Sequence, residues 1–185
     1  MVQQWYEVPV FYFSNPASIY GPDDPVPKPA DSAALDCELE IAAVIGAEGI
    51  AGFTLFADWS ARDLQAREMT VGLGPAKGKD FDTGNALGPV IVTPDEIGDP
   101  TALTMVARVN GQERVRTISG GMQHSIADTL VHISQSETLY PGDVVGLGTV
   151  GNGCGYESLT FLNEGDVVEL EIERIGILRN RLVRS

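Results

Sequence analysis

Short runs of β-branched and aromatic residues, separated by turn signals, recur along most of the chain and constrain its fold class. Such runs between Gly, Pro, Asn and Asp clusters favour strands and hairpins over helices. The clearest turn is Asn110-Gly111, because Asn-Gly between two strand-like runs is typical of a two-residue hairpin. The runs are residues 8–13, 90–93, 104–109, 144–147 and 167–172. We therefore expect a mostly β (α+β) fold.

Two segments depart from this pattern and predict short helices. Residues 60–69 read SARDLQAREM, in which Ser60 can cap a helix and Asp63 stands in the capping-box position. Residues 125–134 place apolar side chains at helical spacing, at Ile126, Leu130 and Ile133. We expect only these few helices among the strands.

Length and charge limit what the chain can bind. Its 185 residues suffice for one domain with a core, and we expect a single domain over residues 1–185. With 26 acidic and 12 basic residues the net charge is −14, which argues against nucleic acid or an anionic membrane as partner. No apolar run is long enough to span a bilayer, and no signal peptide is recognisable, so we expect a cytoplasmic protein.

The segment LDCELEIAAVIG, residues 35–46, combines an apolar strand with regularly spaced acids. Alternate side chains of a strand share a face, so one face carries apolar residues toward a core and the other carries carboxylates. The apolar face holds Leu35, Cys37, Leu39 and Ile41, and the acidic face holds Asp36, Glu38 and Glu40. A solvated outer face would explain this pattern, and so would a cation site.

A further acid, on another strand-like run, favours the cation site. Asp58 ends another apolar run, GFTLFAD, just before the predicted helix. Two glutamates at i and i+2 plus one aspartate from a neighbouring strand can supply three oxygen ligands to a hard divalent cation. Glutamate also has a poor strand propensity, so its repeated use in a core strand needs a reason.

Four blocks of sequence together resemble the fumarylacetoacetate hydrolase family. They are LDCELEIAAVIG, AGFTLFADWSARDLQ, GPAKGKDFDTGNALGP and GDVVGLGTVGNGCGYE, and the resemblance runs from about Trp5 to Leu182. It implies a mixed β-roll or sandwich of that family's C-terminal catalytic domain, without its N-terminal segment. It also implies a divalent metal, Mg²⁺ first and Mn²⁺ or Ca²⁺ as alternatives, and a homodimer.

The resemblance also assigns expected roles to individual residues. Those matching the metal ligands are Glu38, Glu40 and Asp58, while Asp36 matches an acidic position that is not a ligand. Those matching substrate-binding positions are Tyr12, Arg62, Gln65, Gly148 and Thr149. The residues implied in catalysis are Lys79, as the active-site lysine, and Glu157, as a glutamate that orients a histidine or water.

The implied activity is hydrolysis of a carbon–carbon bond in an acylpyruvate-like or fumarylacetoacetate-like diketo acid. The same site could decarboxylate a 2-oxo acid such as oxaloacetate, or isomerise or hydrate a 2-oxo-enoate of aromatic catabolism. A non-catalytic protein that binds metal and an oxo acid is a third hypothesis. The general base separates these readings, and His124 and His132 fit a helix surface better than that role.

Overall fold

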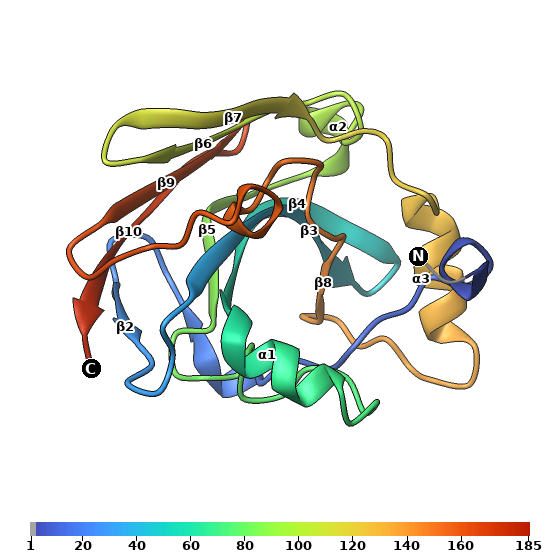
Figure 1. The fold of residues 1–185 in the computed structure, drawn as a ribbon. Helices are drawn as coiled ribbons and strands as arrows, with labels where there is room; N and C mark the ends of the chain where they lie inside the picture. The colour runs from blue at the N-terminus through green and yellow to red at the C-terminus, as the bar shows by residue number, and fades with distance from the viewer. Residues whose placement is uncertain (1–2) are drawn as a thin grey trace.

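The computed structural model describes residues 3–185, whose strands form two five-stranded sheets packed on each other (Figure 1). The first sheet has the order β1-β5-β4-β3-β8. It comprises β1 (Ile19–Tyr20), β3 (Leu35–Gly46), β4 (Gly49–Ala61), β5 (Asn85–Val92) and β8 (Val144–Gly146). The second has the order β2-β10-β9-β6-β7. It comprises β2 (Pro25–Lys28), β6 (Thr104–Val109), β7 (Gln112–Ile118), β9 (Val167–Ile172) and β10 (Gly176–Arg184).

Both sheets are mixed. In each, an N-terminal edge strand pairs in parallel with the inner strand beside it, β1 with β5 and β2 with β10, while the remaining pairs are antiparallel. The helices are short: α1 (Arg62–Met69), α2 (Pro94–Ile97), α3 (Ile126–Ser134), and the 3₁₀ turns η1 (Gln3–Tyr6), η2 (Pro16–Ser18) and η3 (Gly155–Ser158). The predicted mostly β fold with few helices is confirmed.

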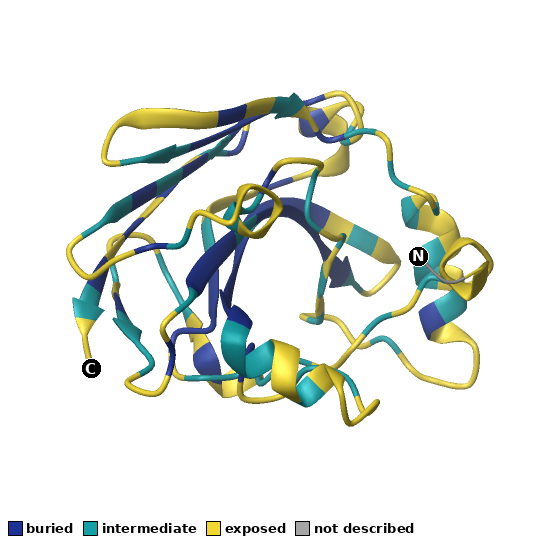
Figure 2. Cartoon of the chain, viewed as in Figure 1, coloured by how far each residue is buried: buried dark blue, intermediate teal, exposed yellow. Residues whose placement is uncertain are grey.

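The β3–β4 hairpin is the longest element and the centre of the molecule. Figure 2 shows that burial runs along nearly the whole of both strands. The apolar face of β3 points into the core as its alternation predicted, with Leu35 and Leu39 fully buried. That face packs with residues of the second sheet such as Met105 and Leu178. The other face of the hairpin is therefore available to carry a site.

Local predictions had mixed outcomes. Asn110 and Gly111 both have positive φ, 53° and 75°, as a two-residue hairpin turn between β6 and β7 requires. Ser125 caps α3 by accepting a hydrogen bond from Asp128 N–H.

Two expectations were wrong. Residues 8–13 form no strand, because they pair with neither sheet and leave Val10 and Phe13 exposed. Ser60 does not cap α1, since β4 continues to Ala61 and the Ser60 hydroxyl donates to the Asp58 carbonyl instead.

Among residues 3–185, no helix combines the length and the apolar character needed to cross a membrane.

Candidate metal centre

Three carboxylates converge on the face of the β3–β4 hairpin that points away from the core. Glu38 pairs directly with Asp58 across the antiparallel register, and Glu40 lies two residues further along β3. One oxygen from each lies within 4.8 Å of the others, which is close enough for the three acids to share one metal ion. No other such group is found among residues 3–185. Glu40 and Asp58 are 4% and 3% exposed, so the alternative of a solvated outer face is wrong.

Two cations hold this carboxylate cluster (Glu38, Glu40 and Asp58) together. The Lys79 ammonium donates to Glu38 Oε2 at 2.8 Å and to Asp58 Oδ2 at 2.7 Å. The Arg62 guanidinium donates to the other oxygen of Glu38 at 2.7 Å. Each oxygen of Glu38 therefore has a cationic donor.

The loop that carries Lys79 is fixed to helix α1. Glu68, near the end of α1, accepts hydrogen bonds from Ala76 N–H and Gly78 N–H. Gly78 in turn accepts through its carbonyl from Ala61 N–H at the end of β4. The strand that supplies Asp58 and the loop that supplies Lys79 are thus held in one unit.

The pKa values of the three acids diverge because the cations favour one of them. Burial raises the pKa of Glu38, but Lys79 and Arg62 outweigh it and lower that pKa to about 2. Burial, then the charges of Asp58 and Glu38, raise the pKa of Glu40 to about 8. Burial raises the pKa of Asp58 to about 6, with Lys79 opposing and Glu38 adding to the rise. The cluster therefore has more negative charge than its own cations can stabilise.

The residues present fit a divalent cation. When all three carboxylates are ionised, as metal ligands are, they and the one ammonium leave two uncompensated negative charges, because Arg62 is shared with a further carboxylate, Asp36. Asp58 Oδ2 accepts from both Lys79 and the Tyr12 hydroxyl, whereas Asp58 Oδ1 is buried and has no hydrogen-bond partner among residues 3–185. Buried acceptors normally have a partner, and a hard cation takes oxygen ligands of this kind.

The glycine-rich segment after β8 closes the cluster from the Glu40 side. Gly148 N–H donates to Glu40 Oε2 at 3.1 Å, and the Thr149 hydroxyl makes a longer contact of 3.3 Å with Oε1. Gly146 permits this approach, because a Cβ there would lie 2.8 Å from both Glu40 Oε2 and the Phe56 ring. The expected substrate-binding pair Gly148 and Thr149 thus adjoins a proposed ligand.

Asp36, the remaining acid of β3, has a different environment. Its Oδ1 accepts from Cys37 N–H and Gly155 N–H, and its Oδ2 accepts from Arg62 Nε and Tyr156 N–H. With all four bonds made inside the protein, Asp36 fixes Arg62 and the start of η3. This agrees with the expectation that it is not a ligand.

The other expected site residues are placed unequally. Gln65 lies on α1 and accepts from Arg62 NH1 at 3.1 Å, while Tyr12 reaches Asp58 at 2.9 Å. Glu157 is exposed on η3, where its carboxylate lies 3.8 Å from Cys154 Sγ, and no hydrogen bond found in the described chain joins it to the cluster. His132 packs edge-on against Phe11, and it is not among the residues of the described chain that converge as possible metal ligands.

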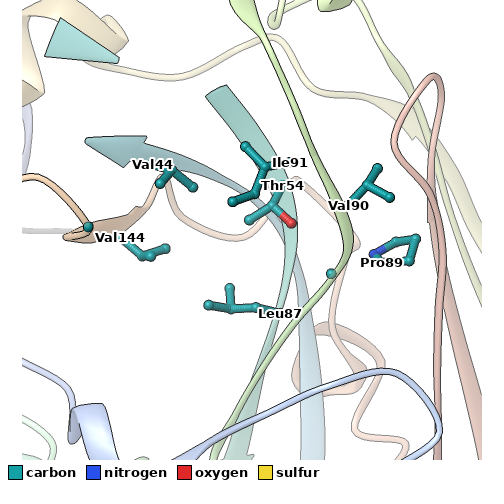
Figure 3. Close-up of a pocket in the computed structure, with 9 residues that line it drawn as sticks. Val44, Thr54, Leu87, Pro89, Val90, Ile91 and Val144 are labelled. Atoms are coloured by element: carbon teal, nitrogen blue, oxygen red, sulfur yellow. The ribbon is translucent and has the colours of Figure 1, made fainter. Parts of the chain in front are cut away.

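A hollow of about 540 Å³ lies on the first sheet, and none of the three cluster acids lines it. Figure 3 shows its lining of aliphatic side chains from β3, β4, β5 and β8, with Thr54 as the one side chain bearing a polar atom. It offers no titratable group or cation, so its size does not make it the centre of the chemistry.

Sequence reasoning missed Tyr156. Its ring lies under the Arg62 guanidinium, with 5.3 Å from Cζ to the ring centroid. Tyr156 follows the glycine-rich segment, and no spacing rule links it to an arginine 94 positions earlier. The two residues are brought together by Asp36 Oδ2, which accepts from both Tyr156 N–H and Arg62 Nε.

Comparison with known proteins agrees with the geometry. The sequence model described as Fumarylacetoacetate (FAA) hydrolase C-terminal matches residues 2–183. The rat protein named "Oxaloacetate tautomerase Fahd2a, mitochondrial" is 38% identical over 187 residues, which cover 95% of this chain and 59% of that protein. This chain therefore spans somewhat over half the length of such relatives.

Solved structures share the fold. A fumarylacetoacetate hydrolase from Exiguobacterium antarcticum superposes with a TM-score of 0.87 at 34% identity, covering 95% of this chain and 66% of that one. A 5-carboxymethyl-2-hydroxymuconate delta-isomerase from Mycobacterium smegmatis gives 0.84 at 35% identity, covering 96% and 70%. These similar proteins carry the names of a tautomerase, a hydrolase and an isomerase.

Proposed function

This chain belongs to the fumarylacetoacetate hydrolase family, and from that premise we propose that it is a divalent-metal-dependent enzyme of 2-oxo and 2,4-dioxo acids, with carbon–carbon bond hydrolysis as its reaction. The observation that carries the proposal is the convergence of three carboxylates, two buried and one half-buried, with one buried lysine. A cluster of this charge without substrate or metal function would only destabilise the fold.

Glu38, Glu40 and Asp58 would hold the metal, with Mg²⁺ as the first candidate and Mn²⁺ or Ca²⁺ as alternatives. A bound divalent cation supplies Lewis-acid polarisation of the substrate carbonyl. The unpartnered Asp58 Oδ1 supports this assignment most directly.

The chain's own cations would stabilise charge that develops on the substrate. Burial lowers the pKa of the Lys79 ammonium, but Asp58 and Glu38 more than reverse this and raise it, so the group stays charged. Arg62 is fixed by Asp36 and needs little reorganisation to act. Gly148 N–H and the Thr149 hydroxyl are further donors at the Glu40 side, suited to a carboxylate or oxo group of the substrate.

Hydrolysis requires water to add to the C4 carbonyl of a 2,4-dioxo acid, after which the C3–C4 bond breaks. The electron pair of that bond goes to C3 as a 2-oxo acid enolate, and a proton from water ends on C3, giving a carboxylic acid and pyruvate. Glu157 is the proposed proton acceptor for the attacking water. Glu157→Gln should then lower hydrolysis while leaving metal affinity unchanged.

Proton transfer within a 2-oxo acid, as tautomerisation or isomerisation, is the second candidate function. The 38% identity to a protein named as an oxaloacetate tautomerase favours it, and so does the exposed position of Glu157. Both reactions pass through an enolate, and they differ in whether water attacks.

One set of assays separates the candidates. The protein is incubated with 2,4-dioxohexanoate and with oxaloacetate, each with Mg²⁺ and with a chelator. Metal-dependent formation of pyruvate and propionate supports the hydrolase. Metal-dependent acceleration of enol-to-keto conversion of oxaloacetate without CO₂ supports the tautomerase, and CO₂ release supports a decarboxylase. Turnover that the chelator does not affect contradicts the metal-dependent proposal.

We also propose a homodimer, as the family resemblance implies. Light scattering of the purified chain should give twice the chain mass, and a monomer mass at micromolar concentration would contradict it.

A further inference from the structure

A second hollow, of about 290 Å³, lies between helix α1 and η3. Its lining is Arg62, Gln65, Ala66, Met69 and Tyr156. Nothing in the proposed reaction uses Ala66, Met69 or Tyr156. Met69 and Tyr156 are 52% and 56% exposed, which is a large apolar exposure for two neighbouring rim residues.

Arg62 connects this hollow to the carboxylate cluster. Its NH2 group donates to Glu38 at 2.7 Å, so one side of the guanidinium belongs to the cluster. Its NH1 group donates to Gln65, and its Cζ lies 5.3 Å from the Tyr156 ring centroid, so the other side lines the hollow. A molecule bound at the cluster and extending past Arg62 would enter the hollow.

The charge of the hollow disfavours an anion at its outer end. Arg62 is the one cation of the lining, and two carboxylates, Asp36 and Glu38, already neutralise it at 2.8 and 2.7 Å. Beyond Arg62 and Gln65 the surface is formed by the methyl group of Ala66, the thioether of Met69 and an aromatic ring. A carboxylate placed there would lose hydration without gaining a cationic partner.

Resting on the proposed function, we propose that this hollow is a subsite for the uncharged, apolar tail of a 2-oxo acid. The enzyme would then prefer monocarboxylic substrates with an alkyl or aryl tail over dicarboxylic substrates of equal length. Met69 and Tyr156 are the specificity-determining residues. Each methylene covered by them should tighten binding about twofold to threefold, since the rim covers it only in part.

Inert analogues test this without turnover. N-substituted oxamates keep the adjacent carbonyl and carboxylate of a 2-oxo acid and carry a variable tail. Oxamate, N-butyl oxamate and N-(2-carboxyethyl) oxamate are titrated by calorimetry into the full chain in saturating Mn²⁺. We expect N-butyl oxamate to bind about 10-fold more tightly than oxamate, and the carboxyethyl compound no more tightly than oxamate.

Two variants assign the effect to the hollow. Met69→Lys adds a cation at the rim and should reverse the order of the butyl and carboxyethyl compounds. Val71→Lys makes the same change at a residue that is 69% exposed and outside the lining, and it should preserve the order.

The outcomes separate this inference from the proposed function. Binding of oxamate with no gain from the butyl tail, or an unchanged order in Met69→Lys, overturns the subsite while leaving the function intact. Failure of oxamate itself to bind the metal-loaded protein overturns both.

Discussion

Glu38 and Asp58 form a directly opposed pair in the antiparallel register of β3 and β4, and a single ammonium, that of Lys79, donates to both. Like charges opposite each other on a sheet are destabilising. The pair persists because Lys79 lies between the two carboxylates, and the third acid, Glu40, leaves an excess of negative charge. The arrangement yields predictions for metal affinity, stability and pH dependence.

Asp58→Asn should weaken Mn²⁺ or Mg²⁺ binding about 100-fold, because it removes one charge from the cluster while keeping the side-chain shape. Titration calorimetry on the chelator-stripped protein measures this. Glu48→Gln is the matched control, since Glu48 is exposed at the turn of the same hairpin. Equal affinities for Asp58→Asn and the unmodified protein would exclude Asp58 as a ligand.

Lys79→Met should destabilise the metal-free protein by about 3 kcal/mol or more, because it leaves the buried Asp58 beside the half-buried Glu38 without the shared cation. Added Mn²⁺ should recover part of this loss, while enzymatic turnover should not return. Urea denaturation with and without Mn²⁺ gives the comparison. Lys77→Met, at an exposed position two residues away, should change stability little, and a similar loss there would show that the effect is not specific.

The metal-free protein should lose stability as pH rises from about 4.5 to about 8. The pKa of Glu40 is raised from 4.5 to about 8 on folding, so its contribution is fully present below pH 4.5 and is lost as pH rises through 8. Asp58, raised from 3.8 to about 6, acts in the same direction, whereas the lowered pKa of Glu38, about 2, affects stability only below pH 4.5.

Denaturation in chelator at a series of pH values should therefore show a decline of a few kcal/mol toward alkaline pH. Glu40→Gln should flatten most of this slope, because it removes the carboxylate whose pKa is raised the most. Saturating Mn²⁺ should flatten it as well. If stability in chelator instead increases from pH 5 to pH 8, the pKa values of Glu40 and Asp58 are not raised by folding, and the prediction is wrong.

Gly146→Ala should cost about 1–3 kcal/mol and weaken metal binding, because the new methyl group would lie 2.8 Å from Glu40 Oε2 and from the Phe56 ring. Gly151→Ala, in the same glycine-rich segment, meets nothing within 4 Å and should change stability by less than about 0.5 kcal/mol. Thermal denaturation and Mn²⁺ titration of both variants test the difference. Equal effects would show that the approach of β8 to Glu40 is not tightly constrained.

The sequence predicted the strand pattern well where alternation and turn chemistry act locally. The inward face of β3 and the Asn110-Gly111 turn follow from period and φ preference alone. It failed where tertiary pairing decides: residues 8–13 have strand composition but no partner strand. Ser60 resembles a helix cap but belongs to the end of β4.

For the candidate site, local pattern identified the acids on β3 and the acid at the end of β4, and the register brings them together. The hollow beside Arg62 was not predictable from local sequence. Met69 is on α1 and Tyr156 is on η3, and these two elements are brought together by Asp36, which accepts hydrogen bonds from Arg62 and from Tyr156 N–H. The position of Glu157, exposed on η3, likewise depends on how that loop docks.

The acids of β3 and the backbone groups that bond them come from distant parts of the chain. Gly148 bonds Glu40 across 108 positions, and Gly155 bonds Asp36 across 119. A ribosome-bound chain that has emerged only through β4 therefore has the acids but lacks the enclosing loop and Lys79. Metal binding would then occur late in synthesis, after the last third of the polypeptide has folded against the β3–β4 hairpin.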